Sequence, residues 1–405
     1  MVGLHTQRQL QPGKSRCGRR TVYAALAIAV SVIASACASA SGQSTPKNLP
    51  PLVLEKPPVT LGKLVTRGPQ GQVPVWYTAV NLTPAQLKKV RDGHYKAAFL
   101  NTQSSPFMNS LQAGATAAFK AMNIKLVATT NSNLSAAQQA QDVQNVLPLR
   151  PNIILTLAVD PVAAAAYFEP AVKQNVKLVF LSNKPNGYQD GKQDVGVVTY
   201  DVSGLGVTTA NAIGQYLHGQ GNIGFMYYDA NFWITNQREA AVLKQLHAKW
   251  PGIHIIAKTP IADPSQAQQI VSAMITKHPD MQALFVPWDS PIAEGAVAAL
   301  RAAHSKIKIF TIDLGGTDAL NMAQCGNVQE ETSTLAYQFG YSAAIEGALG
   351  VLNVKAPPMV VVPAFPVTAA NLAAGWKTTF EQSLPADVAT ATKSANCPTA
   401  APASK

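Results

Sequence analysis

The sequence is short of charged residues, which make up 13% of its 405 residues, whereas hydrophobic residues make up 47%. This apolar content excludes disorder over the whole chain. At roughly 150 residues per domain, the length predicts two domains plus appendages. Acidic residues are fewer than basic ones, 21 against 32, and the net charge is +11, yet the chain contains no long run of Lys or Arg. We therefore expect no nucleic-acid partner.

Patterns that would indicate catalysis or metal binding are also missing. The seven His residues are scattered without paired ligand spacing, which argues against a transition-metal site. No Ser elbow and no Cys–His arrangement supplies a nucleophile. The Gly-x-Gly-x-x-Gly motif at Gly219–Gly224 follows a predicted helix and opens a predicted strand, the reverse of a dinucleotide fingerprint. We expect no metal, no cofactor and no enzymatic activity.

The N-terminus has the pattern of a bacterial export signal. Residues 1–36 contain five basic residues and no Asp or Glu, and they end in the apolar stretch Val22–Ala36. That stretch is too short to cross a bilayer, which takes about 20 residues. The segment Ala34-Ser-Ala-Cys37 resembles a lipobox, in which the Cys is lipidated and becomes the mature N-terminus. We expect a signal peptide over 1–36 and a lipid anchor at Cys37 on the outer face of the cytoplasmic membrane, with plain cleavage near Ala36 or Ala40 as the alternative.

The segment after Cys37 has a different composition. Residues 38–72 are rich in Ser, Pro, Gly and Lys and show no periodicity. Such a segment cannot bury enough surface to offset its ordering entropy. We expect 37–72 to be a lipidated, flexible tether that lifts the folded body off the membrane. Residues 384–405, rich in Ala, Pro, Ser and Thr, form a similar tail.

From residue 73 onward, short apolar runs alternate with amphipathic stretches. Thr83 and Pro84 suit the N-cap and first position of a helix over about 84–92. Strands are predicted at 96–100, 125–129, 153–157, 177–181 and 195–199, and again at 222–228, 253–258, 282–287 and 307–312, with helices between them. Such alternation indicates βαβ units and parallel sheets. Two successive sets predict an α/β fold of two doubly wound parallel-sheet lobes.

In sheets of this kind, ligands bind beyond the carboxyl ends of the strands. Most of the polar and aromatic residues that stand out in this chain follow predicted strands, at 101–108, 158–161, 200–203, 229–238, 288–291 and 313–317. This coincidence predicts a binding site at those strand ends.

Six segments at these strand ends resemble those of a known family: Ser104-Ser-Pro-Phe-Met108, Val159-Asp-Pro161, Asn236-Gln-Arg238, Trp288-Asp-Ser290, Thr311-Ile-Asp313 and Thr334–Gly340. Over roughly 93–380 the chain resembles the ribose-binding group of the sugar-binding proteins of ABC importers, which have the type I periplasmic binding protein fold. The resemblance implies two lobes joined by a three-stranded hinge, with crossings near 200–203, 334–336 and 362–366. The implied lobes are 73–201 with 335–362, and 202–334 with 363–383.

The resemblance also implies ligand contacts. Phe107 would stack on the ligand, Asp160 and Asp313 would accept hydroxyl protons, and Arg238 would offer a planar fork of donors. Trp233 or Trp288 would cover apolar C–H faces. The alternatives are helix N-caps for the two Asp residues, a salt bridge for Arg238 and a place in the core for the two Trp residues.

Two departures from the family bear on the ligand. Trp288 stands where the family has Asn, and Thr334 stands where it has a binding Gln. Each change removes an amide that both donates and accepts hydrogen bonds. The ligand is therefore expected to be smaller or less hydroxylated than ribose.

The function that the resemblance implies is capture of a sugar or polyol between two lobes and delivery to the permease of an ABC importer, by a monomer. A ligand-sensing receptor subunit of a signalling system would close in the same way and is the first alternative. A less favoured one is an exported enzyme with Asp160 and Asp313 as its acid/base pair. The ligand itself stays open.

The four cysteines fall into two pairs. Cys17 lies in the signal and Cys37 at the lipobox, so Cys325 and Cys397 remain. Outside the cytosol, two leftover thiols favour a disulfide. We expect a Cys325–Cys397 bridge that joins the tail to the second lobe, with two free thiols as the alternative.

Overall fold

The computed structural model describes residues 49–57 and 59–394. The predicted signal peptide, Cys37 and Cys397 lie outside the described residues. Cys325 is disulfide-bonded, and its pairing with Cys397 remains a prediction. Within the described part, no helix has both the length and the apolar character needed to cross a membrane.

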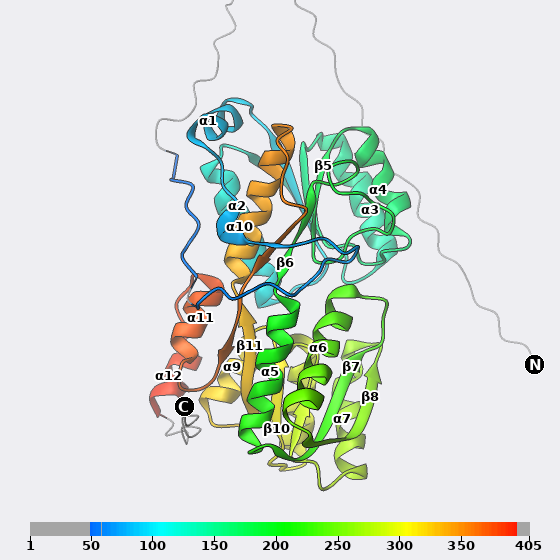
Figure 1. Cartoon of the computed structure of the whole chain (residues 1–405), viewed down its shortest axis with the longest axis vertical. Helices are drawn as coiled ribbons and strands as arrows, with labels where there is room; N and C mark the ends of the chain where they lie inside the picture. The colour runs from blue at the N-terminus through cyan, green and yellow to red at the C-terminus, as the bar shows by residue number, and fades with distance from the viewer. Residues whose placement is uncertain (1–48, 58, 395–405) are drawn as a thin grey trace, which may run out of the picture. The chain divides into compact units, whose positions relative to one another are not determined.

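Seven parallel strands form the first sheet, in the order β1-β12-β6-β5-β4-β2-β3 (Figure 1). Their bounds are β1 Val75–Trp76, β2 Lys96–Asn101, β3 Lys125–Asn131, β4 Ile153–Thr156, β5 Lys177–Leu181, β6 Gly196–Tyr200 and β12 Met359–Val362. Their helices are α1 Pro84–Asp92, α2 Pro106–Ala121, α3 Ala136–Val146, α4 Ala164–Lys173 and α10 Ala336–Val351. Helices α2 and α10 pack together on one face of this sheet, and α3 and α4 cover the other.

Six strands form the second sheet, in the order β13-β11-β10-β9-β7-β8, with only β13 antiparallel to its neighbour. Their bounds are β7 Gln220–Tyr228, β8 Gly252–Ile261, β9 Ala283–Phe285, β10 Lys308–Ile312, β11 Val328–Thr334 and β13 Ala364–Val367. Their helices are α5 Val202–Tyr216, α6 Trp233–Lys249, α7 Ala267–Lys277, α8 Glu294–Ala302, α9 Gly316–Ala323, α11 Leu372–Phe380 and α12 Ala386–Ser394. Helices α5 and α6 pack together, as do α7 and α8.

The two sheets confirm the predicted fold class of two parallel-sheet α/β lobes. The chain passes between them three times, from β6 to α5, from β11 to α10 and from β12 to β13. The predicted helix over 84–92 is α1, and it begins with a capping box. The Thr83 hydroxyl accepts a hydrogen bond from the Gln86 N–H, and the Gln86 side chain accepts one from the Thr83 N–H.

Part of the segment expected to be a flexible tether lies against the folded body (Figure 1). We call residues 49–57 and 59–72 the strap. The Val53 N–H donates to the Tyr341 hydroxyl at 3.1 Å, and the Gln72 amide donates to Asp190 at 3.1 Å. The Thr66 hydroxyl donates to Asp201 at the first crossing between the sheets. These contacts differ from the expectation because the strap, though rich in Pro and Gly, carries apolar side chains that pack on the core: Leu52, Leu54 and Val59.

Candidate functional site

Arg238 is the centre of the site at the strand ends. It lies on α6, is only 3% exposed, and its guanidinium donates to the Tyr200 hydroxyl and to the Pro287 carbonyl, both at 2.6 Å. Among the described residues its Nε–H has no hydrogen-bond partner. Tyr200 ends β6 of the first sheet, so this bond joins α6 to the strand that enters the first crossing. A donor fork that is held from two sides is well placed to orient a ligand.

Asp313 follows β10 and faces Arg238. Its carboxylate lies 3.6 Å from the guanidinium, and its second oxygen has no partner among the described residues. Its backbone has φ +74°, in the left-handed region that Asp tolerates better than most residues. Burial raises the pKa of Asp313, and the nearby Arg238 opposes that rise. The N-cap alternative is not observed, since the N-cap of α9 is Gly315, without a side-chain cap.

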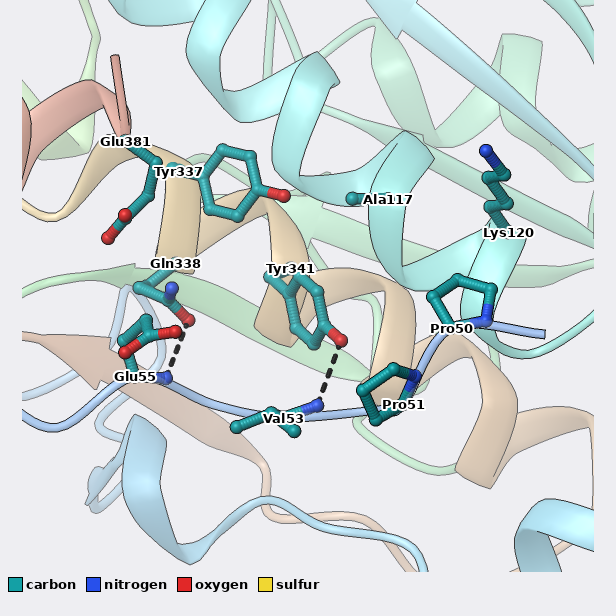
Figure 2. A pocket seen from close by; sticks show the side chains of 10 residues that line it. All are labelled: Pro50, Pro51, Val53, Glu55, Ala117, Lys120, Tyr337, Gln338, Tyr341 and Glu381. Atoms are coloured by element: carbon teal, nitrogen blue, oxygen red, sulfur yellow. Dashed lines mark hydrogen bonds between the residues drawn. The ribbon is translucent and has the colours of Figure 1, made fainter. Parts of the chain in front are cut away.

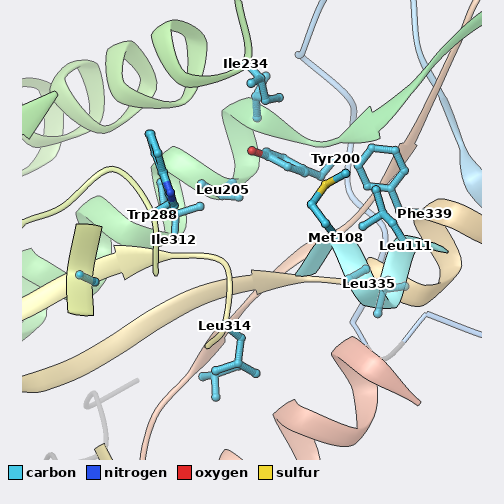
Figure 3. Packing of buried hydrophobic residues seen from close by; sticks show 14 of the residues in the cluster. Met108, Leu111, Tyr200, Leu205, Ile234, Trp288, Ile312, Leu314, Leu335 and Phe339 are labelled. Carbon is cyan, nitrogen blue, oxygen red and sulfur yellow. The ribbon is translucent and has the colours of Figure 1, made fainter. Parts of the chain in front are cut away.

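Aromatic rings lie near this ion pair, and Figure 3 shows three of them, Tyr200, Trp288 and Phe339, among the buried hydrophobic residues. The centre of the Trp288 ring lies 5.9 Å from the Arg238 guanidinium carbon, and Trp288 itself is 6% exposed. Phe107, at the start of α2, packs edge-to-face on Tyr200 at 6.4 Å and on Phe339 at 6.2 Å. The structure thus brings together four predicted residues, Phe107, Arg238, Trp288 and Asp313, around Tyr200.

The other predicted residues make no hydrogen bond, ion pair or aromatic ring contact with this group in the described structure. Thr334 ends β11, is fully buried, and its hydroxyl has no partner among the described residues. Trp233 is the first residue of α6 and packs, half-buried, against the core. Asp160 accepts hydrogen bonds from the backbone N–H groups of Val162 and Ala163, at 2.8 and 3.1 Å. Ligand binding by these three remains a prediction.

Asp160 is not the N-cap of α4, which is Ala163, but its hydrogen bonds to the turn before α4 lead to a test. Replacing Asp160 with Ala leaves two N–H groups before α4 without their acceptor and is expected to lower the free energy of unfolding by about 1 kcal/mol. Asp160→Ser keeps an acceptor and should restore most of that loss in urea unfolding. Equal stability of the Ala and Ser variants would contradict this stabilising role in the turn. A ligand affinity that falls in both variants would show that Asp160 also binds ligand.

Buried carboxylates lie behind Asp313. Asp289 follows β9, Asp318 lies in the first turn of α9, and Glu331 lies on β11. Burial raises the pKa of all three well above the usual range, and their mutual repulsion raises it further for Asp289 and Glu331. In the described part of the chain, no three His, Cys, Asp or Glu residues are grouped so as to hold a metal ion.

Sequence reasoning missed one residue of this site, Tyr200, and one residue that holds α6, Asn183. Tyr200 was noted only as part of a crossing, although it contacts both Arg238 and Phe107. Asn183, fully buried, accepts a hydrogen bond from the Ile234 N–H at 3.1 Å and so links the loop after β5 to α6. The sequence offered one indication of them, which was their position: Tyr200 ends a buried strand, and Asn183 follows one.

The comparisons with known proteins agree with the fold. Residues 96–347, more than half of the chain, match the family described as periplasmic binding protein domain. The chain belongs to this family. No curated protein is significantly similar to it in sequence.

Solved structures share the fold of this periplasmic binding protein. A solute-binding protein of an ABC transporter from Agrobacterium vitis, bound to α-D-tagatopyranose, is 17% identical with a TM-score of 0.64, over 71% of this chain and 100% of that chain. One from Actinobacillus succinogenes, with D-allose, is 22% identical with a TM-score of 0.61, over 69% and 99%. One from Mycobacterium smegmatis, with glycerol, is 21% identical with a TM-score of 0.63, over 72% and 99%. At these identities the likeness shows the fold, that of the type I periplasmic binding proteins.

Proposed function

We propose that this periplasmic binding protein captures a small sugar or polyol between its lobes and delivers it to the permease of an ABC importer. The observation that carries the proposal is the group formed by Arg238, Asp313 and Tyr200, enclosed by Phe107 and Trp288. Vicinal hydroxyls both donate and accept, so they match a carboxylate and a guanidinium side by side. Aromatic walls suit the apolar C–H faces of the same ligands.

The size of the site supports a small ligand. Trp288 packs on Tyr228 with ring centres 5.0 Å apart and takes up volume beside Arg238. Of the five N–H donors of the Arg238 guanidinium, one donates to Tyr200 and one to Pro287, and the Nε–H has no partner among the described residues. A short polyol or a small furanose needs few donors. Solute-binding proteins of the same fold, crystallised with glycerol and with monosaccharides, support this size range.

The proposal also covers the export, the membrane anchoring, the oligomeric state and the lobe boundaries of the protein. The signal peptide, the lipid anchor at Cys37, the monomeric state and the lobe boundaries at 201, 334 and 362 are retained as expectations. The three crossings would act as a hinge, because ligand contacts on both lobes favour the closed state. The permease would then bind the closed form.

Thermal unfolding of the purified chain against a panel of sugars, polyols and amino acids tests the proposal. A ligand at 100 times its dissociation constant stabilises the folded state by about 2.7 kcal/mol, which is readily measured. The stabilisation should disappear in Arg238→Ala and in Asp313→Ala, and persist in Arg301→Ala, which alters an exposed Arg of α8. Absence of any response to polyhydroxylated compounds by folded, ligand-free protein would refute it. Recovery of a chemically altered ligand would point to an enzyme instead.

A further inference from the structure

The strap is bound to the lobe of the first sheet near both of its ends. Near its start, the Val53 N–H donates to the hydroxyl of Tyr341 on α10, at 3.1 Å (Figure 2). Near its end, the Gln72 amide donates to Asp190, in the loop between β5 and β6, at 3.1 Å. The strap precedes residues 96–347, which match the periplasmic binding protein domain, so any role that it has is additional to that domain.

Between these two ends, the strap contacts the first crossing to the second lobe. Thr66 is 1% exposed, and its hydroxyl donates to the Asp201 carboxylate and accepts a hydrogen bond from the Ser203 N–H at 3.1 Å. Asp201 is the N-cap residue of α5, but its side chain makes no cap bond. Thr66 therefore does from the strap what an N-cap side chain does from within the helix. The Asp201 N–H also donates to the Val362 carbonyl at 2.9 Å, which links the first crossing to the third.

These bonds bear on the movement of the lobes. Lobes that close about a hinge do so by changing the backbone dihedral angles of a few residues in the crossings. The bonds of Thr66 are made with one backbone geometry of residues 201–203, so bending at this crossing must break or distort them. Bonds that are made in one arrangement of two lobes stabilise that arrangement.

We propose that the strap is a fourth segment of the hinge, in which Thr66 is a positioning residue that favours the arrangement with the two lobes in contact. Loss of its hydroxyl should make the lobes separate more often, so that a bound solute leaves faster. This inference rests on the hinge of the proposed function but not on the chemistry of the ligand.

A hydrogen bond between the lobes that does not involve the strap reports on their separation. The Ile234 N–H lies in the first turn of α6, where the helix itself offers no acceptor. It donates to Asn183, a fully buried residue of the first lobe, at 3.1 Å. Hydrogen exchange of the Ile234 amide is therefore expected to follow the opening of the lobes.

The test is amide hydrogen exchange of the ligand-free full chain, measured by NMR at Ser203 and Ile234. Thr66→Val keeps the shape of the side chain and removes the hydroxyl, so both amides should exchange roughly three- to tenfold faster than in the wild type. Thr66→Ser keeps the hydroxyl and should retain the wild-type rates. Thr60→Val is the matched control, since Thr60 is an exposed threonine of the strap, and it should change neither rate.

A further amide separates opening of the lobes from a general loss of stability. The Gln86 N–H in the first turn of α1 donates to the hydroxyl of Thr83 in the same lobe, so its exchange should stay at the wild-type rate. Faster exchange at Ser203 alone would show that Thr66 only caps α5 and would overturn the proposal. Unchanged exchange at both sites, or equal acceleration at Gln86, would overturn it too. No ligand is present, so neither this result nor that of the solute panel depends on the other.

Discussion

Replacing Gly340 with Ala is expected to lower the free energy of unfolding by about 3 kcal/mol or more. A Cβ on Gly340 would lie 1.8 Å from the Leu111 carbonyl oxygen, and one on Gly114 would lie 1.9 Å from the Tyr337 carbonyl oxygen. The two glycines thus allow α2 and α10 to cross with their backbones in contact. Neither carbonyl can move without displacing its helix, so the added methyl group must push the helices apart. Urea unfolding of Gly340→Ala, followed by far-UV circular dichroism, measures the loss.

Gly316→Ala is the control for this substitution. Gly316 is the first residue of α9, its φ is not positive, and a Cβ there would meet no atom within 4 Å. The change should alter stability by no more than about 0.5 kcal/mol, or stabilise slightly through helix propensity. A loss of less than 1 kcal/mol in Gly340→Ala would mean that α2 and α10 separate easily, and would contradict the close crossing.

The alternation of strands and helices could be predicted because the apolar periodicity is a local property of the sequence. Every predicted strand corresponds to a strand of the structure, within a few residues. The strap could not be predicted in this way. Its contacts with Tyr341, Asp190 and Asp201 join residues more than a hundred positions apart. Composition indicates how much surface a segment can bury but not which surface it meets.

For the site, the sequence could identify residue types at strand ends but not their partners. Arg238, Asp313, Trp288 and Phe107 lie together because parallel strands end at one edge of each sheet. Asp160 shows the limit of identifying ligand contacts from sequence. An Asp between a strand and a helix fits both a ligand contact and a bond to the backbone of the following turn, and the hydrogen bonds of Asp160 are with backbone N–H groups. Which residue at a strand end faces the ligand depends on the turn that follows, and no pattern in the sequence predicted it.

Stability is expected to fall as the pH rises, and Glu330 gives the most direct measure. Glu330 lies on β11 with 2% exposure, and the only hydrogen bond that its side chain receives from a described residue comes from the Thr332 hydroxyl, at 2.8 Å. Burial raises the pKa of Glu330 from 4.5 to about 8, and the Thr332 bond opposes that rise. Between these values the unfolded chain releases the proton while the folded chain keeps it. The free energy of unfolding therefore decreases as the pH rises through this window. The contribution of protonated Glu330 to it is fully present only below the window.

Glu330→Gln removes this titration and keeps an acceptor for Thr332. At pH 5, residue 330 has a neutral side chain in the folded form of both the variant and the wild type, so the pH dependence of stability is compared rather than the absolute stability. Between pH 5 and pH 8, the free energy of unfolding should fall by roughly 2–4 kcal/mol less in the variant than in the wild type. Urea unfolding at both pH values measures this difference, with Glu169→Gln as a surface control that keeps the wild-type slope. Equal slopes for Glu330→Gln and the wild type would show that Glu330 gains enough hydration or charge compensation to ionise in the folded protein. The buried carboxylates Asp289, Asp318 and Glu331 would then be the next to replace, because burial acts on them in the same direction.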